Sequence, residues 1–136
     1  MANLHIKIVT PEKEIFDSEI EQVTVTTPEG EIGVLPHHIN LMAQIIPGEL
    51  RIKDKGKEVI MATGGGLLQV TDNSVVIACD LVEKAEDIDE KAAEEAKKRA
   101  KAALEQTLSD EEYASTLAVL EKSLALLRVK RKHHVR

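Results

Sequence analysis

The sequence predicts a β-rich N-terminal part followed by helices: an antiparallel β-sandwich or flattened barrel, then a C-terminal antiparallel two-helix hairpin. Two observations indicate this class. All seven glycines lie between Gly30 and Gly66 and all four prolines between Pro11 and Pro47, so residues 67–136 contain neither. Apolar residues alternate with polar ones before residue 86, whereas Ala, Glu and Lys dominate afterwards. We therefore expect two domains, residues 1–86 and residues 87–136.

The first domain contains short runs rich in Val, Ile and Thr with a period of two, which favours strands. These runs are Ile6–Thr10, Val23–Thr26 and Glu58–Met61. Turn-forming residues separate the runs, at intervals short enough for hairpins. The turn segments are residues 27–30, 47–48, 54–57 and 71–74. The run Gly64–Gly66 precedes a strand-like segment rather than a helix, so a bulge or close backbone packing is expected there, not a phosphate loop.

The second domain has the signals of two consecutive helices. Asp87 or Asp89 is a candidate N-cap for a first helix that continues through Lys91 to Gln106. Ser109 and Glu112 have the spacing of a capping box, which predicts the start of a second helix. The short connection between the helices indicates an antiparallel hairpin.

The two helices are expected to pack through complementary faces. The first would present small residues and the second large ones at spacings of three and four. The small face is Ala92, Ala93, Ala96, Ala100, Ala103 and Leu104, and the large face is Tyr113, Leu117, Leu120, Leu124 and Leu127. An alanine stripe buries little apolar area, so such a hairpin should detach easily.

Composition excludes several classes of function. The net charge of −6 opposes binding to nucleic-acid phosphates, and Phe16 and Tyr113, with no Trp, provide almost no surface for base stacking. Cys79 is the single cysteine, which is typical of a reduced compartment. No apolar run is long enough to cross a membrane, and the first residues lack the order of a signal peptide. We expect any membrane association to come through partner proteins.

Charge is distributed unevenly along the chain. Residues 1–86 carry 7 basic and 14 acidic groups, whereas residues 87–136 carry 11 basic and 10 acidic ones. The last nine residues hold five basic groups, which is typical either of a docking site for an acidic surface or of a solvated tail.

Catalytic motifs are missing from the sequence: it has no nucleophile elbow, Walker loop, dinucleotide fingerprint or zinc-ligand spacing. His37 and His38 are adjacent and would point to opposite sides of an extended segment, so no metal site is expected. We expect no enzymatic activity from this chain alone.

Two blocks of sequence resemble the epsilon subunit of F-type ATP synthases. The first runs from Thr27 to Leu41 and continues with Pro47–Ile52; the second comprises Gly65–Val70, Val75–Ile77 and Ala85–Asp89. With Val9–Pro11 and the order of strands before helices, the resemblance covers nearly the whole chain.

The resemblance implies a non-catalytic subunit of the rotor's central stalk, at the cytoplasmic face of a bacterial plasma membrane rather than a thylakoid. It would join the gamma subunit to the c ring, with the turn that carries Glu31 and His38 facing both partners. Its helices would restrain ATP hydrolysis by extending into the catalytic alpha/beta head. The candidate inhibitory contacts are Lys122, Arg128, Lys130 and Arg131.

Some members of the family bind ATP at the folded hairpin through a short motif, and this chain keeps only part of it. Ile88, Asp89 and Ala93 match, and Arg99 and Lys122 could supply positive charge, but Ala92 replaces the motif's arginine and Leu126 a later basic residue. Loss of the guanidinium removes a forked phosphate donor. We expect no cofactor, and weakened affinity if ATP binds.

Three hypotheses follow from the sequence. The first is the rotor-stalk regulatory subunit. The second is a nucleotide-sensing module of the same fold, carried by the degraded ATP motif. The third is a small metal-dependent enzyme that uses His5, His37 and His38.

Overall fold

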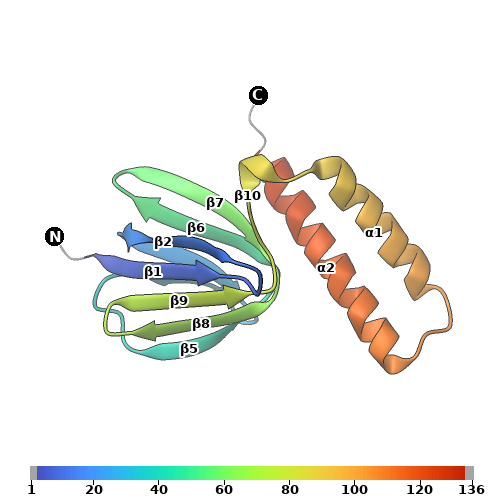
Figure 1. Ribbon diagram of the computed structural model, residues 1–136, viewed down its shortest axis with the longest axis horizontal. Coiled ribbons are helices and arrows are strands. Elements are labelled where there is room, and N and C mark those ends of the chain that lie inside the picture. Colours follow the sequence, from blue (N-terminus) through green and yellow to red (C-terminus); the bar gives the residue numbers. More distant parts are fainter. Residues whose placement is uncertain (1–2, 134–136) are drawn as a thin grey trace.

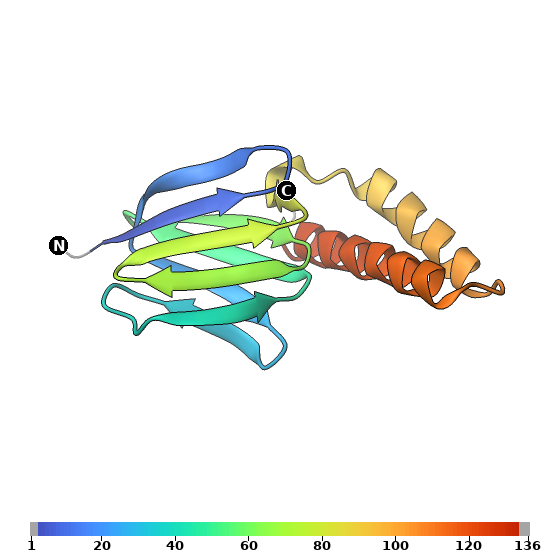
Figure 2. The same ribbon diagram turned by 60° about the horizontal axis from the view of Figure 1, so that its bottom comes forward.

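The computed structural model describes residues 3–133. Within that range the chain forms a β-sandwich of two five-stranded sheets, with a helical hairpin projecting from one end (Figures 1 and 2). The strands are β1 (Leu4–Val9), β2 (Glu14–Ile20), β3 (Gln22–Thr27), β4 (Gly30–Val34), β5 (Leu41–Ile45), β6 (Gly48–Asp54), β7 (Lys57–Thr63), β8 (Gly66–Thr71), β9 (Ser74–Cys79) and β10 (Val82–Lys84). The predicted sandwich followed by helices is confirmed.

The strand order is β2-β1-β9-β8-β5 in one sheet and β10-β7-β6-β3-β4 in the other. Three of the expected turns close hairpins, between β3 and β4, β6 and β7, and β8 and β9. The fourth, at residues 47–48, is not a hairpin turn, because β5 pairs with β8 whereas β6 pairs with β3 and β7 in the opposite sheet. One pair also departs from the expected antiparallel pattern: β1 runs parallel to β9.

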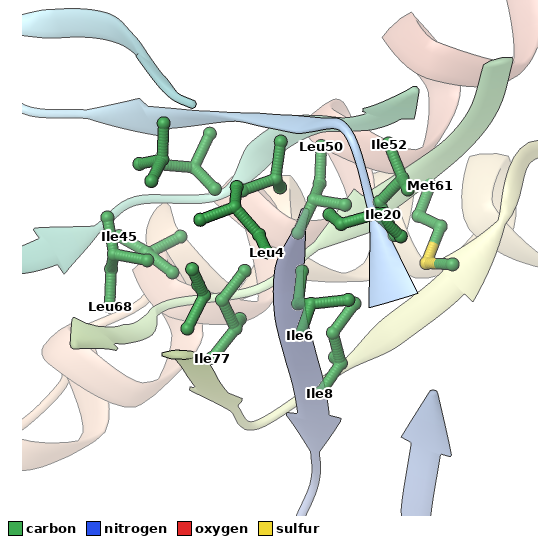
Figure 3. Packing of buried hydrophobic residues seen from close by; sticks show 14 of the residues in the cluster. Leu4, Ile6, Ile8, Ile20, Ile45, Leu50, Ile52, Met61, Leu68 and Ile77 are labelled. Atoms are coloured by element: carbon green, nitrogen blue, oxygen red, sulfur yellow. The ribbon is translucent and has the colours of Figure 1, made fainter. Parts of the chain in front are cut away.

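The core lies between the sheets and consists of the inward-facing residues, which alternate with outward-facing ones along the strands. Leu4, Ile6 and Ile8 of β1 are fully buried, while His5 and Lys7 between them are exposed. Figure 3 shows side chains from both sheets meeting in this layer. The glycine run behaves as expected: a β-carbon on Gly66 would overlap the backbone of Ala78 on the neighbouring strand.

A 3-10 turn, η1 (Ala85–Asp87), leads to the helices α1 (Glu90–Leu104) and α2 (Asp110–Lys132). The Asp89 carboxylate caps α1 by accepting from the Ala92 N–H at 3.0 Å, which decides between the two candidate N-caps. The Ser109 and Glu112 side chains each accept from the other's backbone N–H at 3.1 Å, so the predicted capping box is present.

The C-terminal half of α2 packs against two neighbours at once. One side contacts α1, and another contacts β6, β7 and η1 of the sandwich. The second contact contains an apolar cluster, called the seam here. It consists of Ala62, Ala85, Ile88 and Val129, with Ile60 and Leu126 at its edge.

The expected pairing of one alanine stripe with one leucine stripe is therefore only partly correct. Ala93, Ala100 and Leu127 are buried as expected, but Ala92 is exposed and Tyr113 is 49% exposed. Ala125 and Val129 of α2, outside the expected stripe, are buried instead. The predicted stripe did not include the second apolar face of α2, which packs against the sandwich.

Candidate functional site: sandwich loops and the docked hairpin

Glu31 lies on β4, at the edge of its sheet, and not in a turn. Its two carboxylate oxygens accept from the Arg51 guanidinium on β6 at 2.9 and 3.1 Å. The hydrogen bond from Arg51 lowers the pKa of Glu31 below its ordinary value. Arg51 also donates to Glu49 on its own strand, so one guanidinium links two carboxylates.

His38 lies in the loop that follows β4, at the other end of that strand. The backbone N–H of His37, in the same loop, donates to Asn73 Oδ1 at 2.6 Å in the β8–β9 turn. Asn73 in turn accepts from the backbone of His5, at the start of β1. The loop therefore lies at the end of the sandwich opposite the hairpin (Figure 2). The structure does not bring Glu31 and His38 together, although the resemblance placed them on one surface.

Exposed apolar side chains lie in the His38 loop and on the strand that follows it. Leu35 and Ile39 belong to the loop, and Ile39 is 78% exposed. Met42 on β5 is also exposed. It pairs with Gln69 on β8, which pairs in turn with exposed Val76 on β9. An apolar surface of this kind is typical of a protein contact.

Near Glu31, the C-terminal end of α2 meets the sandwich at Glu49. This carboxylate is largely buried, with 10% of its side chain exposed. It lies 2.7 Å from His133 Nε2 and 3.7 Å from Lys132 Nζ. Burial raises the pKa of Glu49, but the hydrogen bonds with Arg51 and His133 outweigh burial and hold it below the ordinary value.

Three of the four basic candidates on α2 have contacts within the chain. Lys122 forms an ion pair with Asp80, in the link between β9 and β10, at 2.6 Å. Lys130 Nζ lies 3.4 Å from the carbonyl oxygens of Ala85 and Glu86. Arg131 forms ion pairs with two glutamates of α1, Glu90 at 3.4 Å and Glu94 at 2.9 Å.

Arg128, the fourth basic candidate, is exposed and lines a hollow with Glu31, Glu49 and Lys132. Two further residues of the basic C-terminal run, His134 and Arg136, lie outside the described residues.

The residues of the degraded ATP motif have structural contacts of their own. Ile88 is buried in the seam, and the Asp89 carboxylate is occupied by the cap of α1. Ala93 is buried, whereas Arg99 is exposed beside a shallow hollow that it shares with Thr116 of α2. Lys122 pairs with Asp80. These residues therefore contact different parts of the protein.

The histidines named for a metal site have different side-chain partners. His5 Nε2 lies 2.6 Å from Asp17 on the neighbouring strand, whereas His38 Nδ1, in the loop after β4, lies 2.7 Å from the carbonyl oxygen of Ile39. Over residues 3–133, no three His, Cys, Asp or Glu side chains are placed to hold a metal ion. Within the same range, no helix is both long and apolar enough to span a bilayer.

Two important acidic residues were not identified from the sequence. Asp80 and Glu49 provide the carboxylates that hold α2 to the sandwich. Asp80 directly follows an apolar strand and Glu49 follows a Pro-Gly pair. Charged residues are common at such turn positions, so neither one was distinctive in the sequence. Only the placement of α2 reveals them.

Comparisons with known proteins agree with this architecture. A family model described as "ATP synthase, Delta/Epsilon chain, beta-sandwich domain" matches residues 3–85, and one described as "ATP synthase, Delta/Epsilon chain, long alpha-helix domain" matches residues 86–131. An ATP synthase epsilon chain from Laribacter hongkongensis is 38% identical over 130 residues, covering 94% of this chain and 93% of the relative. Another from Alkalilimnicola ehrlichii is 36% identical over 128 residues, covering 93% and 91%.

Solved structures show the same fold. A chain of the Euglena gracilis mitochondrial ATP synthase, in an assembly described as OSCP/F1/c-ring, matches with a TM-score of 0.77 and 26% identity, over 93% of this chain and 80% of that one. A chain of the Tetrahymena thermophila mitochondrial ATP synthase, described as central stalk/c-ring, matches with a TM-score of 0.69 and 16% identity, over 93% and 96%. With two family models that together span residues 3–131, the chain belongs to the ATP synthase delta/epsilon chain family.

Proposed function

We propose that the chain is a non-catalytic subunit of the central stalk of an F-type ATP synthase, in which the sandwich and the hairpin have different roles. The sandwich joins the gamma subunit to the c ring, and the hairpin restrains ATP hydrolysis by the catalytic alpha/beta head. Family membership and the c-ring assemblies of the two similar solved structures support this role. The complex would be peripheral to the cytoplasmic face of a bacterial plasma membrane, held there by partner subunits.

The observation that supports a mobile hairpin is the small area that holds it to the sandwich. Apart from α1, α2 packs mainly against β6, β7 and η1, and the apolar part of that contact is the seam. The half of the hairpin near the α1–α2 loop extends beyond the sandwich (Figure 1). Few apolar contacts, together with ion pairs of which Lys122–Asp80 is partly exposed on both sides, make undocking inexpensive relative to unfolding of the sandwich.

The basic residues would then change partners between two states. In the docked state Lys122, Lys130 and Arg131 contact groups of this chain. Undocking breaks the contacts of Lys122 and Lys130 with the sandwich and its 3-10 turn, and leaves their charges available to an acidic surface of the catalytic head. Such contacts are screened by salt.

The test is ATP hydrolysis by a catalytic head from which the native subunit has been removed. We expect the full chain to inhibit hydrolysis at low salt and to inhibit less at high salt. A truncation that ends at Glu86 should bind without inhibiting. Equal inhibition by the truncation would overturn the role of the hairpin, and failure of both to bind would overturn the stalk role.

For the sandwich, we propose that Glu31 and His38 contribute to separate contacts, because they lie at opposite ends of it. The exposed apolar surface around the His38 loop supports a protein partner there. Ile39→Asp should weaken binding to a complex of gamma and c ring. Glu19→Gln, which changes an exposed residue of β2, should not. Equal binding by both variants would contradict the assignment.

We also propose that the chain uses no bound ATP. Asp89 is occupied by the cap of α1, Ala92 stands where the motif has an arginine, and Leu126 packs at the edge of the seam. Titration calorimetry with ATP and magnesium should give no saturable heat. Stoichiometric binding would overturn this proposal and favour the nucleotide-sensing module.

A further inference from the structure

The ion pair between Asp80 and Lys122 has a prepared position on the sandwich. Asp80 follows β9, and its backbone N–H donates to the Gly65 carbonyl at 3.1 Å. One residue on, the Leu81 carbonyl accepts from the Gly64 N–H at 2.9 Å. These two hydrogen bonds hold the link between β9 and β10 against the glycine run.

Gly64 also leaves room for the Asp80 side chain. A β-carbon at Gly64 would overlap Asp80 Oδ1, so the carboxylate occupies the space that any other residue at position 64 would fill. The other oxygen, Oδ2, lies 2.6 Å from Lys122 Nζ. The backbone of the sandwich therefore directs this carboxylate toward α2.

On the helix, Lys122 lies one turn before Leu126 at the edge of the seam. Among the described residues, the polar contacts that α2 makes with the sandwich begin at Lys122 and end at His133. The half of the hairpin near the α1–α2 loop extends beyond the sandwich. Among the described residues, Lys122 is thus the polar contact with the sandwich that lies nearest to that loop.

We propose that Asp80 and Lys122 form a latch that holds the inhibitory hairpin docked and keeps Lys122 away from the catalytic head. The importance of this latch for ATP hydrolysis rests on the function proposed above for the hairpin, but the latch itself is a property of the isolated chain. Both side chains are partly exposed, 45% for Asp80 and 30% for Lys122. Loss of the pair should raise the undocked population about two- to fivefold.

Undocking can be measured with a cysteine at Val129, which is 2% exposed in the seam. In the Val129→Cys background, a neutral alkylating reagent can reach that thiol only after α2 leaves the sandwich. The native Cys79 gives little background, because burial raises its pKa to about 12. The alkylation rate then follows the undocked population.

We expect Asp80→Asn and Lys122→Gln each to increase the alkylation rate two- to fivefold, and the double variant to be no faster than either single one. Exchange of the two charges, Asp80→Lys with Lys122→Asp, should restore the slow rate. Gly64→Ala, which displaces the carboxylate and removes no charge, should also increase the rate. Asp72→Asn is the matched control, since it removes one exposed negative charge from the β8–β9 turn at the far end of the sandwich.

Equal rates for Asp80→Asn and Asp72→Asn would overturn the latch, as would a charge exchange that does not restore docking. A second measurement separates the latch from the function of the hairpin. Asp80→Asn should lower, by the same factor, the concentration of chain needed for half-inhibition of a catalytic head. Faster alkylation with unchanged inhibition would support the latch and overturn the inhibitory role.

Discussion

Val129→Ala should release the hairpin without weakening the sandwich. Val129 is 2% exposed and packs in the seam with Ala62, Ala85 and Ile88. The substitution removes two buried carbons at about 0.8 kcal/mol each, and the space left behind raises the cost to about 2 kcal/mol. Because about 1.4 kcal/mol corresponds to a factor of ten, the ratio of undocked to docked hairpin should rise about thirtyfold.

Hydrogen exchange monitored by mass spectrometry can measure this change. Once undocked, the two helices have only each other to pack against, so amides of α1 and α2 should exchange through the undocked state. We expect exchange in the seam half of α2 to become about thirtyfold faster in Val129→Ala. Exchange in β1 and β9 should be unchanged, since these strands lie in the sheet opposite the one that α2 packs against.

Val119→Ala is the matched control. It makes the same chemical change on the same helix and brings the same gain in helix propensity, but Val119 is 45% exposed. Its effect should be about fivefold at most. Equal effects of the two variants, or faster exchange throughout the sandwich in Val129→Ala, would refute the idea that the seam determines docking.

Other predictions concern the cap, the acidic contacts and the cysteine. Ser109→Ala removes the capping box and should cost about 1 kcal/mol, seen as faster exchange at the start of α2, whereas Ser115→Ala on the exposed helix surface should not have this effect. The pKa of Glu49 is lowered in the folded state, so its contribution to stability is present above the ordinary value of 4.5 and is lost as pH falls through the folded pKa. The difference in urea midpoint between the native chain and Glu49→Gln should therefore shrink below pH 4.5, and a constant difference would contradict the role of the carboxylate charge. Cys79, whose pKa burial raises to about 12, should react with thiol reagents at pH 8 only after denaturation, and rapid labelling of the native chain would show that the thiol is accessible.

Local patterns predicted the elements well. The period-two runs became strands, the run of Ala, Glu and Lys became α1, and the Ser109 capping box starts α2 where expected. These features depend on residues a few positions apart, which a sequence displays directly. The resemblance to the epsilon family also came from continuous segments, and the family models confirm it.

The sequence alone therefore determined the class of fold, the capping box of α2 and the family, because each is expressed in neighbouring residues. The tertiary structure decided which residues far apart in the chain meet. It placed Glu31 and His38 at opposite ends of the sandwich, and it paired Lys122 with Asp80, 42 positions earlier. It also gave α2 a second apolar face. The periodicity of a helix shows which residues share a face, but only the packing of the whole chain determines what that face meets.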